Sequence, residues 1–175
     1  SIADSVDEYL SVDLTSDEAI GKFLSGDPRD YRQIDILVNN AHDMSRESGF
    51  NSRNLPRGNP LAYFEREHWK HNFDLGMLVP ADLILWFGSQ MVSHSHGSII
   101  NIATMYALVA PSPLLYQGTD LMNPPAYGAA KAGLIAFTRY VASFWGQYGV
   151  RCNAICPGPF PKSVNADNQE FVSRL

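Results

Sequence analysis

Hydrophobic residues gather in three short runs along the chain, and each run ends in polar or small residues. The runs cover residues 33–41, 97–104 and 149–158, and the first is rich in β-branched side chains. Near-continuous apolar runs of this length are typical of parallel strands that are covered on both faces. We therefore predict three strands of a buried parallel sheet.

Between these runs, hydrophobic residues recur every three or four positions, as one face of a helix requires. Thr15 or Ser16 fits the N-cap of the first helix, and acidic residues follow in its first turn. The second and third helical patterns form either two helices or one helix bent near Pro80. Gly149 is suited to end the longest helix. The predicted helices cover residues 15–24, 65–76, 80–91 and 127–149.

The alternation of helix and strand predicts an α/β fold with a parallel sheet. A length of 175 residues is ordinary for one domain, so we expect residues 1–175 to form a single domain. Two segments fit neither element. Residues 44–60 are polar and rich in Gly, Pro and Asn, and residues 110–125 are rich in Pro. Loops of this length in a compact domain are often functional or mobile.

Charge and hydropathy narrow the range of partners. The net charge is −5 and no run of Lys or Arg stands out, so neither nucleic acid nor an anionic membrane is expected as a partner. The most apolar stretch, residues 75–88, is shorter than the roughly 18 residues of a membrane helix and contains Pro80 and Asp82. The first ten residues show no signal-peptide pattern. We therefore expect a cytoplasmic protein.

Cysteine and histidine spacing gives no sign of a metal site. Cys152 and Cys156 form a C-x3-C pattern, whereas redox and zinc sites commonly use C-x2-C. Their even separation places both side chains on one side of a strand, and we expect two reduced structural thiols. His94 and His96 lie in a predicted loop with no further ligands nearby in the sequence. No metal is expected.

The pair Tyr127 and Lys131 carries the clearest chemistry. Their i, i+4 spacing places both side chains on one face of the longest helix. Free tyrosine has a pKa near 10, and a nearby ammonium favours the phenolate and lowers that pKa. Tyr127 could then exchange a proton with a substrate oxygen. The alternative is a pair of helix-surface residues that share a face by chance.

Thr104 stands at the end of a predicted strand. In open α/β sheets, binding sites form at the carboxyl ends of the strands. A hydroxyl at this edge could donate a hydrogen bond to the same substrate oxygen that Tyr127 serves.

Four motifs occur together in an order and spacing that resemble the short-chain dehydrogenase/reductase family, in its single-domain branch. They are DILVNNA at 35–41, GSIINIAT at 97–104, YGAAKAG at 127–133 and GVRCNAICPG at 149–158. The resemblance extends from about residue 10 to about residue 165. It implies a Rossmann-like, doubly wound parallel sheet and an NAD(P)-dependent oxidoreductase. The enzyme would move a hydride between nicotinamide and a small carbonyl or alcohol substrate.

The resemblance also implies roles for individual residues. Thr104 matches the residue that polarises the substrate oxygen, and Tyr127 matches the general acid/base. Lys131 matches the lysine that lowers the tyrosine pKa and binds the nicotinamide ribose. The residues matched to the cofactor site, besides Tyr127 and Lys131, are Asp13, Asn39, Asn40, Ala41, Pro157 and Gly158. Asp13 matches an aspartate near the adenine. Asn39, Asn40 and Ala41 match a turn that supports the sheet and lines the cofactor, and Pro157 and Gly158 match a turn beside the nicotinamide.

The chain departs from the family pattern at both ends and at three single positions, the first of which is threonine in place of serine at 104. The glycine-rich phosphate loop has no counterpart, so we expect a partial fold that lacks this N-terminal unit, the middle of a larger protein cut at both ends. The choice between NAD and NADP is therefore not readable. His42 replaces a glycine and is either a tolerated substitution or a contact to cofactor or substrate. Gly76 stands where the family has a proton-relay asparagine, and Asn72 lies one turn earlier.

The resemblance implies assembly as a homodimer or homotetramer through helix 127–148, with Phe144, Trp145 and Tyr148 at the interface. Two alternatives to the oxidoreductase stay open. The first is a truncated, non-catalytic homologue that serves as a binding or regulatory module. The second is a sugar-nucleotide-modifying enzyme on the same fold, which the long insert before Tyr127 favours and the Asn-Asn-Ala motif opposes.

Overall fold

Three parallel strands form the centre of the structure, which is a computed structural model. They are β1 (Ile36–Asn39), β2 (Gly97–Ile102) and β3 (Val150–Ile155), in the order β1-β2-β3. The three predicted strands and their parallel arrangement are confirmed, although each strand is shorter than its hydrophobic run. The structure describes residues 10–27, 33–45, 48–49, 61, 64–117, 122–159 and 172–174.

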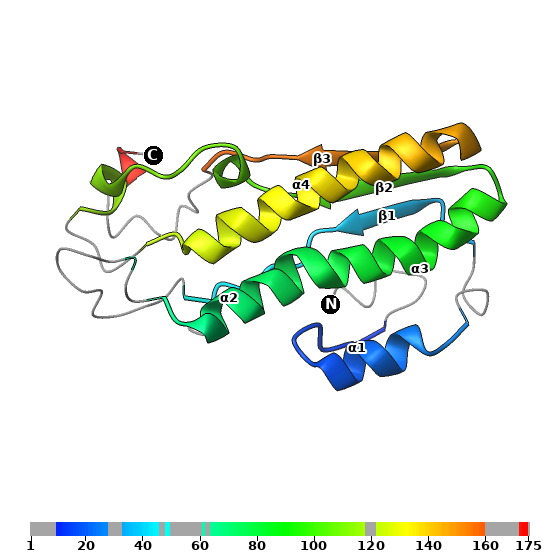
Figure 1. The fold of residues 1–175 in the computed structure, drawn as a ribbon, viewed down its shortest axis with the longest axis horizontal. Coiled ribbons are helices and arrows are strands. Elements are labelled where there is room, and N and C mark those ends of the chain that lie inside the picture. Colours follow the sequence, from blue (N-terminus) through cyan, green and yellow to red (C-terminus); the bar gives the residue numbers. More distant parts are fainter. Residues whose placement is uncertain are drawn as a thin grey trace.

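Side chains alternate between the two faces of this sheet. Ile99 and Val150 are buried beneath the helices, while Ile36 and Val38 on the opposite face are 63% and 51% exposed. In Figure 1 the helices α2, α3 and α4 lie in front of the sheet, on one face. The expectation of two covered faces is therefore wrong for the described part of the chain. Apolar runs put hydrophobic side chains on both faces, and the described helices cover one.

Helix α1 (Asp17–Leu24) begins where the sequence predicts. Ser16 is the N-cap, and its hydroxyl oxygen accepts a hydrogen bond from the Ala19 N–H at 3.2 Å. The Phe23 ring packs against Trp86 and Phe87 of helix α3 (Val79–Ser93), with ring centroids 4.8 and 6.3 Å apart. Aromatic packing therefore attaches α1 to α3 rather than directly to the sheet.

The second and third predicted helices form one continuous unit. Helix α2 (Arg66–Phe73) runs through the π-helical turn η4 (Asp74–Leu78) into α3. The π turn ends two residues before Pro80, which lacks the N–H that an α-helix would use at that position. The structure therefore selects the single-helix alternative.

This unit, Arg66–Ser93, has 28 residues and is long and apolar enough by composition to cross a membrane. The argument that residues 75–88 are too short for such a span was wrong, because the helix continues beyond them on both sides. Half of its most apolar window is buried inside the protein, and one helix of this kind is weak evidence of a membrane span.

Helix α4 (Pro125–Trp145) has Pro124 as its N-cap and Pro125 as its first residue. It passes into the 3-10 turn η7 (Gly146–Tyr148) and ends at Gly149, as predicted. Gly149 has φ 74°, and a Cβ there would lie 2.4 Å from the Ser95 carbonyl oxygen. Both the left-handed backbone and the close approach require glycine.

The hydrophobic stripe of α4 divides into a buried part and an exposed part. Leu134 and Val141 are buried, and Trp145 packs over Gly88 of α3. Phe144 is 63% exposed and Tyr148 is also exposed. Trp145 therefore belongs to the core rather than to an outer surface. Pairing of two copies through this helix stays a prediction.

The two predicted loops differ in how far they are described. The Pro-rich segment at 110–125 contains the 3-10 helix η6 (Pro113–Tyr116), and η5 (Met105–Ala107) precedes it. Most of the predicted loop at 44–60 lies outside the described residues.

Buried polar groups connect the sheet to α4. The Asn39 side-chain amide donates to the Asn101 side-chain oxygen at 2.8 Å, and the Asn101 amide donates to the Thr138 hydroxyl at 2.9 Å. This chain of bonds links β1, β2 and α4 across the core.

Cys152 of β3 lies beside Asn101, and burial raises the pKa of its thiol to about 11. Cys152 and Cys156 are both free thiols, as expected.

Candidate active site

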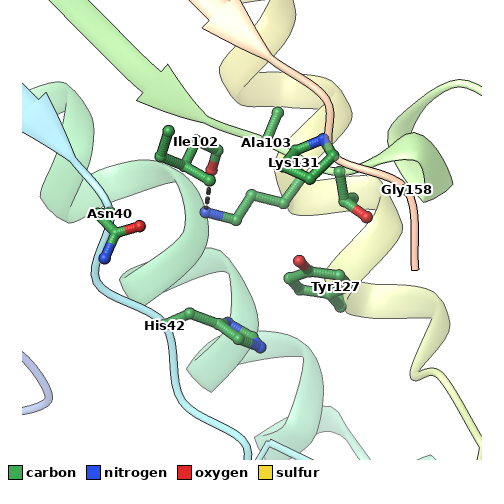
Figure 2. A pocket seen from close by; sticks show the side chains of 9 residues that line it. Asn40, His42, Ile102, Ala103, Tyr127, Lys131 and Gly158 are labelled. Atoms are coloured by element: carbon green, nitrogen blue, oxygen red, sulfur yellow. Dashed lines mark hydrogen bonds between the residues drawn. The ribbon is translucent and has the colours of Figure 1, made fainter. Parts of the chain in front are cut away.

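A pocket of about 240 Å³ opens at the carboxyl ends of the three strands. The loops after β1, β2 and β3 and the start of α4 supply its walls (Figure 2). Its lining residues are Asn40, His42, Ile102, Ala103, Thr104, Tyr127, Lys131, Pro157 and Gly158. The pocket therefore occupies the edge at which α/β sheets bind their ligands.

Thr104 is buried at the point where the chain leaves β2. It is the N-cap of η5, and its hydroxyl accepts a hydrogen bond from the Tyr106 N–H at 3.3 Å. The next residue, Met105, donates its N–H to the Pro157 carbonyl at 3.1 Å. These bonds hold the loops after β2 and β3 together, so the Thr104 hydroxyl has a fixed place in the pocket wall.

Tyr127 lies in the first turn of α4 with its ring in the pocket (Figure 2). Burial raises the pKa of its phenol, and a hydrogen bond with the Thr104 side chain opposes that rise. The expectation that Lys131 lowers this pKa is therefore wrong for the structure as it stands. Desolvation disfavours the phenolate more than the nearby hydroxyl favours it.

Lys131 lies one turn further along α4, and its side chain is only 2% exposed. Its ammonium donates a hydrogen bond to the Ile102 carbonyl oxygen at 2.9 Å, drawn as the dashed line in Figure 2. Burial lowers the pKa of this amine. The carbonyl at the end of β2 is thus the partner that keeps the cation in the pocket wall.

His42 also lies in this pocket. Its ring centroid is 4.6 Å from that of Tyr127, and the two planes are tilted by 41°. The pKa of His42 is lowered to about 4, first by burial against the pocket wall and then by the positive charge of Lys131. The residue as a whole is nevertheless exposed. At neutral pH it is therefore an uncharged imidazole.

Six of the predicted site residues line the pocket together: Asn40, Thr104, Tyr127, Lys131, Pro157 and Gly158. Three do not. Asn39 points into the sheet and binds Asn101. Asp13 is exposed, and its carboxylate accepts hydrogen bonds from the Thr15 N–H and hydroxyl at 2.9 and 2.7 Å, which lower its pKa. Ala41 is exposed and is not a lining residue.

Sequence reasoning missed Ile102 and Ala103, which line the pocket beside Thr104. Their position at the end of β2 was the available signal. The chemistry of Ile102 lies in its backbone carbonyl, however, and no residue-type pattern reveals a backbone acceptor.

Asn72 does not line the pocket. Its buried amide donates to the carbonyl oxygens of Ser48 and His68, both at 2.8 Å. Gly76 packs against α4, where a Cβ would lie 3.2 Å from the Ala130 Cβ. Asn72 therefore holds residue 48 against α2, and its place in a proton relay stays a hypothesis.

Among the described residues, no three His, Cys, Asp or Glu side chains group as a metal site would require.

Comparisons with known proteins agree with this geometry. A family model described as Enoyl-(Acyl carrier protein) reductase matches residues 1–174. A 2-dehydro-3-deoxy-D-gluconate 5-dehydrogenase of Bacillus subtilis is 33% identical over 149 residues, which are 85% of this chain and 50% of that protein. A 7alpha-hydroxysteroid dehydrogenase of Bacteroides fragilis is 31% identical over 144 residues, 81% of this chain and 48% of that protein.

A solved structure shares the fold. The crystal structure of a candidate NAD(P)-dependent gluconate 5-dehydrogenase from Beutenbergia cavernae, with NADP bound at low occupancy, has a TM-score of 0.72 and 25% identity. The match covers 99% of this chain and 64% of that one. The chain spans about half the length of the curated relatives that it matches. On the family model, the relatives and the shared fold, this chain belongs to the short-chain dehydrogenase/reductase family.

Proposed function

We propose that this chain carries the reaction centre of an NAD(P)-dependent oxidoreductase that acts on a small carbonyl or alcohol substrate. One observation supports this most directly. Thr104, Tyr127 and Lys131, from two different elements, line a single pocket at the carboxyl ends of the strands. A hydroxyl, a phenol and an ammonium in one pocket provide what proton transfer to a carbonyl oxygen requires.

The donor set of the pocket fits the nicotinamide end of such a cofactor. The Lys131 ammonium and the Asn40 amide supply polar contacts. Pro157 and Gly158 line the pocket with an apolar ring and with main-chain atoms. These four residues would hold the group there. When bound, the cofactor supplies or accepts the hydride at the substrate carbon.

Residues of this chain supply the proton that the substrate oxygen takes up during reduction. In the direction of reduction, the substrate oxygen accepts hydrogen bonds from the Thr104 hydroxyl and the Tyr127 phenol. As the carbon gains a hydride, the oxygen gains negative charge and takes the phenolic proton, which leaves an alcohol. The raised pKa of Tyr127 keeps the phenol protonated at neutral pH, as a general acid must be. Lys131 lies one turn away, and its ammonium, which donates to the Ile102 carbonyl oxygen, is placed to contact the cofactor.

The first test is a titration of the protein with NADH and NADPH, followed by nicotinamide fluorescence, and then assays with a panel of carbonyl substrates. We expect Tyr127→Phe to bind the cofactor as the wild type does and to lose turnover by about 10²–10⁴-fold, the usual contribution of a general acid. Tyr140→Phe, an exposed tyrosine on the same helix, is the matched control.

Near-normal rates in Tyr127→Phe would contradict the proposed role of the tyrosine. A folded wild-type protein that binds neither nucleotide would favour the non-catalytic alternative instead.

A further inference from the structure

His42 is a side chain of the pocket that the proposed reaction does not use. It follows β1 and points toward Tyr127 in Figure 2, with Asn40 beside it on the same loop. The contact between the two rings, at 4.6 Å between centroids, places the imidazole next to the phenol that serves the reacting oxygen. Whatever group flanks that oxygen in a substrate therefore comes close to His42.

The backbone holds His42 from both sides. Asn39, three residues earlier, is buried and bound through its amide to Asn101. Asp43, the next residue, binds the His71 ring at 2.7 Å and accepts the Ser45 N–H at 2.9 Å. His71 belongs to α2, so the loop is fastened to the sheet at one end and to a helix at the other. The imidazole is thus presented at a fixed place, as a specificity contact requires.

The charge state of His42 narrows the kind of group that it can bind. A neutral imidazole has one N–H donor and one acceptor nitrogen. The pocket already holds one cation, Lys131, whose field favours the uncharged ring. A carboxylate or phosphate would be matched by a second cation, whereas a hydroxyl is matched by a neutral group that both donates and accepts.

We propose that His42 binds a hydroxyl group on the carbon next to the reacting carbon. The substrate is then a hydroxylated carbonyl compound or the corresponding alcohol, such as a polyol, a ketose or a sugar acid, rather than a plain ketone. The inference rests on the proposed function, which places the reacting oxygen at Thr104 and Tyr127.

A matched substrate pair tests this directly. Acetoin carries a hydroxyl on the carbon next to its carbonyl, and butan-2-one is the same molecule without that hydroxyl. The readout is the ratio of kcat/KM for acetoin to kcat/KM for butan-2-one. We expect His42→Phe, which keeps an aromatic ring but has no hydrogen-bonding atom, to lower this ratio about tenfold, the worth of one hydrogen bond.

Two controls sharpen the experiment. His42→Gln retains a donor and an acceptor and is expected to restore part of the ratio. His96→Phe makes the same replacement at an exposed site before β2 and should leave the ratio as it is in the wild type. Equal loss for both substrates would overturn the proposal, because His42 would then act on Tyr127. A tenfold loss of NADH affinity in His42→Phe would also overturn it, by assigning the residue to the cofactor.

A second measurement does not depend on turnover. The imidazole nitrogen signals of His42, assigned by their loss in His42→Phe, are followed by NMR while acetoin or sorbitol is added. We expect these signals to shift, and butan-2-one or hexan-2-ol at the same concentration to leave them in place. The absence of a hydroxyl-dependent shift would overturn the proposal. If the oxidoreductase function were wrong instead, NAD(P)H would fail to bind while the hydroxyl-dependent shift persisted.

Discussion

At the scale of single residues, Tyr127 shows how the fold sets the chemistry of a side chain. Four positions separate it from Lys131, and that spacing alone predicts a lowered phenol pKa. In the structure the lysine donates to the Ile102 carbonyl, and burial acts on the phenol in the opposite direction. The spacing places the two groups on one face, but it does not determine which of them is more strongly desolvated.

This reversal leads to a prediction about pH. Without added cofactor, we expect the Tyr127 phenol to titrate above the ordinary value of about 10. Lys131→Met should leave that titration largely unchanged. In assays, alcohol oxidation should rise as the pH rises toward the folded-state pKa, because only the phenolate can accept the proton.

The difference in phenolate absorbance between the wild type and Tyr127→Phe gives the titration of this one residue. A midpoint below pH 10 that moves upward in Lys131→Met would show that the ammonium governs Tyr127 after all.

At the scale of elements, the contact between α3 and α4 determines where the site residues of α4 lie. Gly88 of α3 faces the Trp145 ring, and a Cβ at Gly88 would lie 2.3 Å from Trp145 Cζ3. The two helices can approach this closely because residue 88 has no side chain. The same approach places the Trp145 end of α4 over the core and the Tyr127 end at the mouth of the pocket.

We therefore expect Gly88→Ala to destabilise the protein by about 1–3 kcal/mol, the usual cost of overpacking. Gly21→Ala in α1 is the matched control, because nothing lies within 4 Å of a Cβ there. It should stabilise the protein by about 0.5–1 kcal/mol through helix propensity. Urea denaturation followed by circular dichroism measures both. Equal effects of the two substitutions would mean that the Trp145 ring simply moves aside.

At the scale of the whole molecule, a buried polar chain joins elements that are far apart in the sequence. Asn39 of β1, Asn101 of β2 and Thr138 of α4 are linked by hydrogen bonds of 2.8 and 2.9 Å. Each amide is buried and needs its partner, since an unpaired buried polar group costs about 1–3 kcal/mol. The loops that begin at the ends of β1 and β2 carry His42 and Thr104, so this chain of bonds also holds the pocket walls together.

A double-mutant cycle tests the coupling. Asn101→Leu should cost about 1–3 kcal/mol, because it leaves the Asn39 amide buried and unpaired. Asn39→Leu should cost a similar amount. The double variant should cost less than the sum of the two by about 0.5–3 kcal/mol, the range seen for residues in contact. Additive effects in the denaturation midpoints would mean that this hydrogen bond does not contribute to stability.

Much of the fold and of the candidate site could be predicted from the sequence, because both depend on local order. Near-continuous apolar runs located the three described strands, helical spacing located the described α-helices, Ser16 and Gly149 marked two helix ends, and the polar or small residues after each strand marked one edge of the sheet. The carboxyl ends of parallel strands meet at one edge, which is why Asn40, Thr104, Pro157 and Gly158 line a common pocket. The start of α4 adds Tyr127 and Lys131 to it.

The tertiary structure alone decided the rest. Adjacent residues 39 and 40 are both asparagine, yet one is buried against Asn101 and the other lines the pocket, because the chain leaves the sheet between them. Only the tertiary structure shows that the His42 ring lies beside Tyr127, with 4.6 Å between the ring centroids. Desolvation, which sets the pKa directions of His42, Tyr127 and Lys131, depends on atoms distant in the sequence. The sequence determined which groups could meet, and packing decided which of them do and in what state of charge.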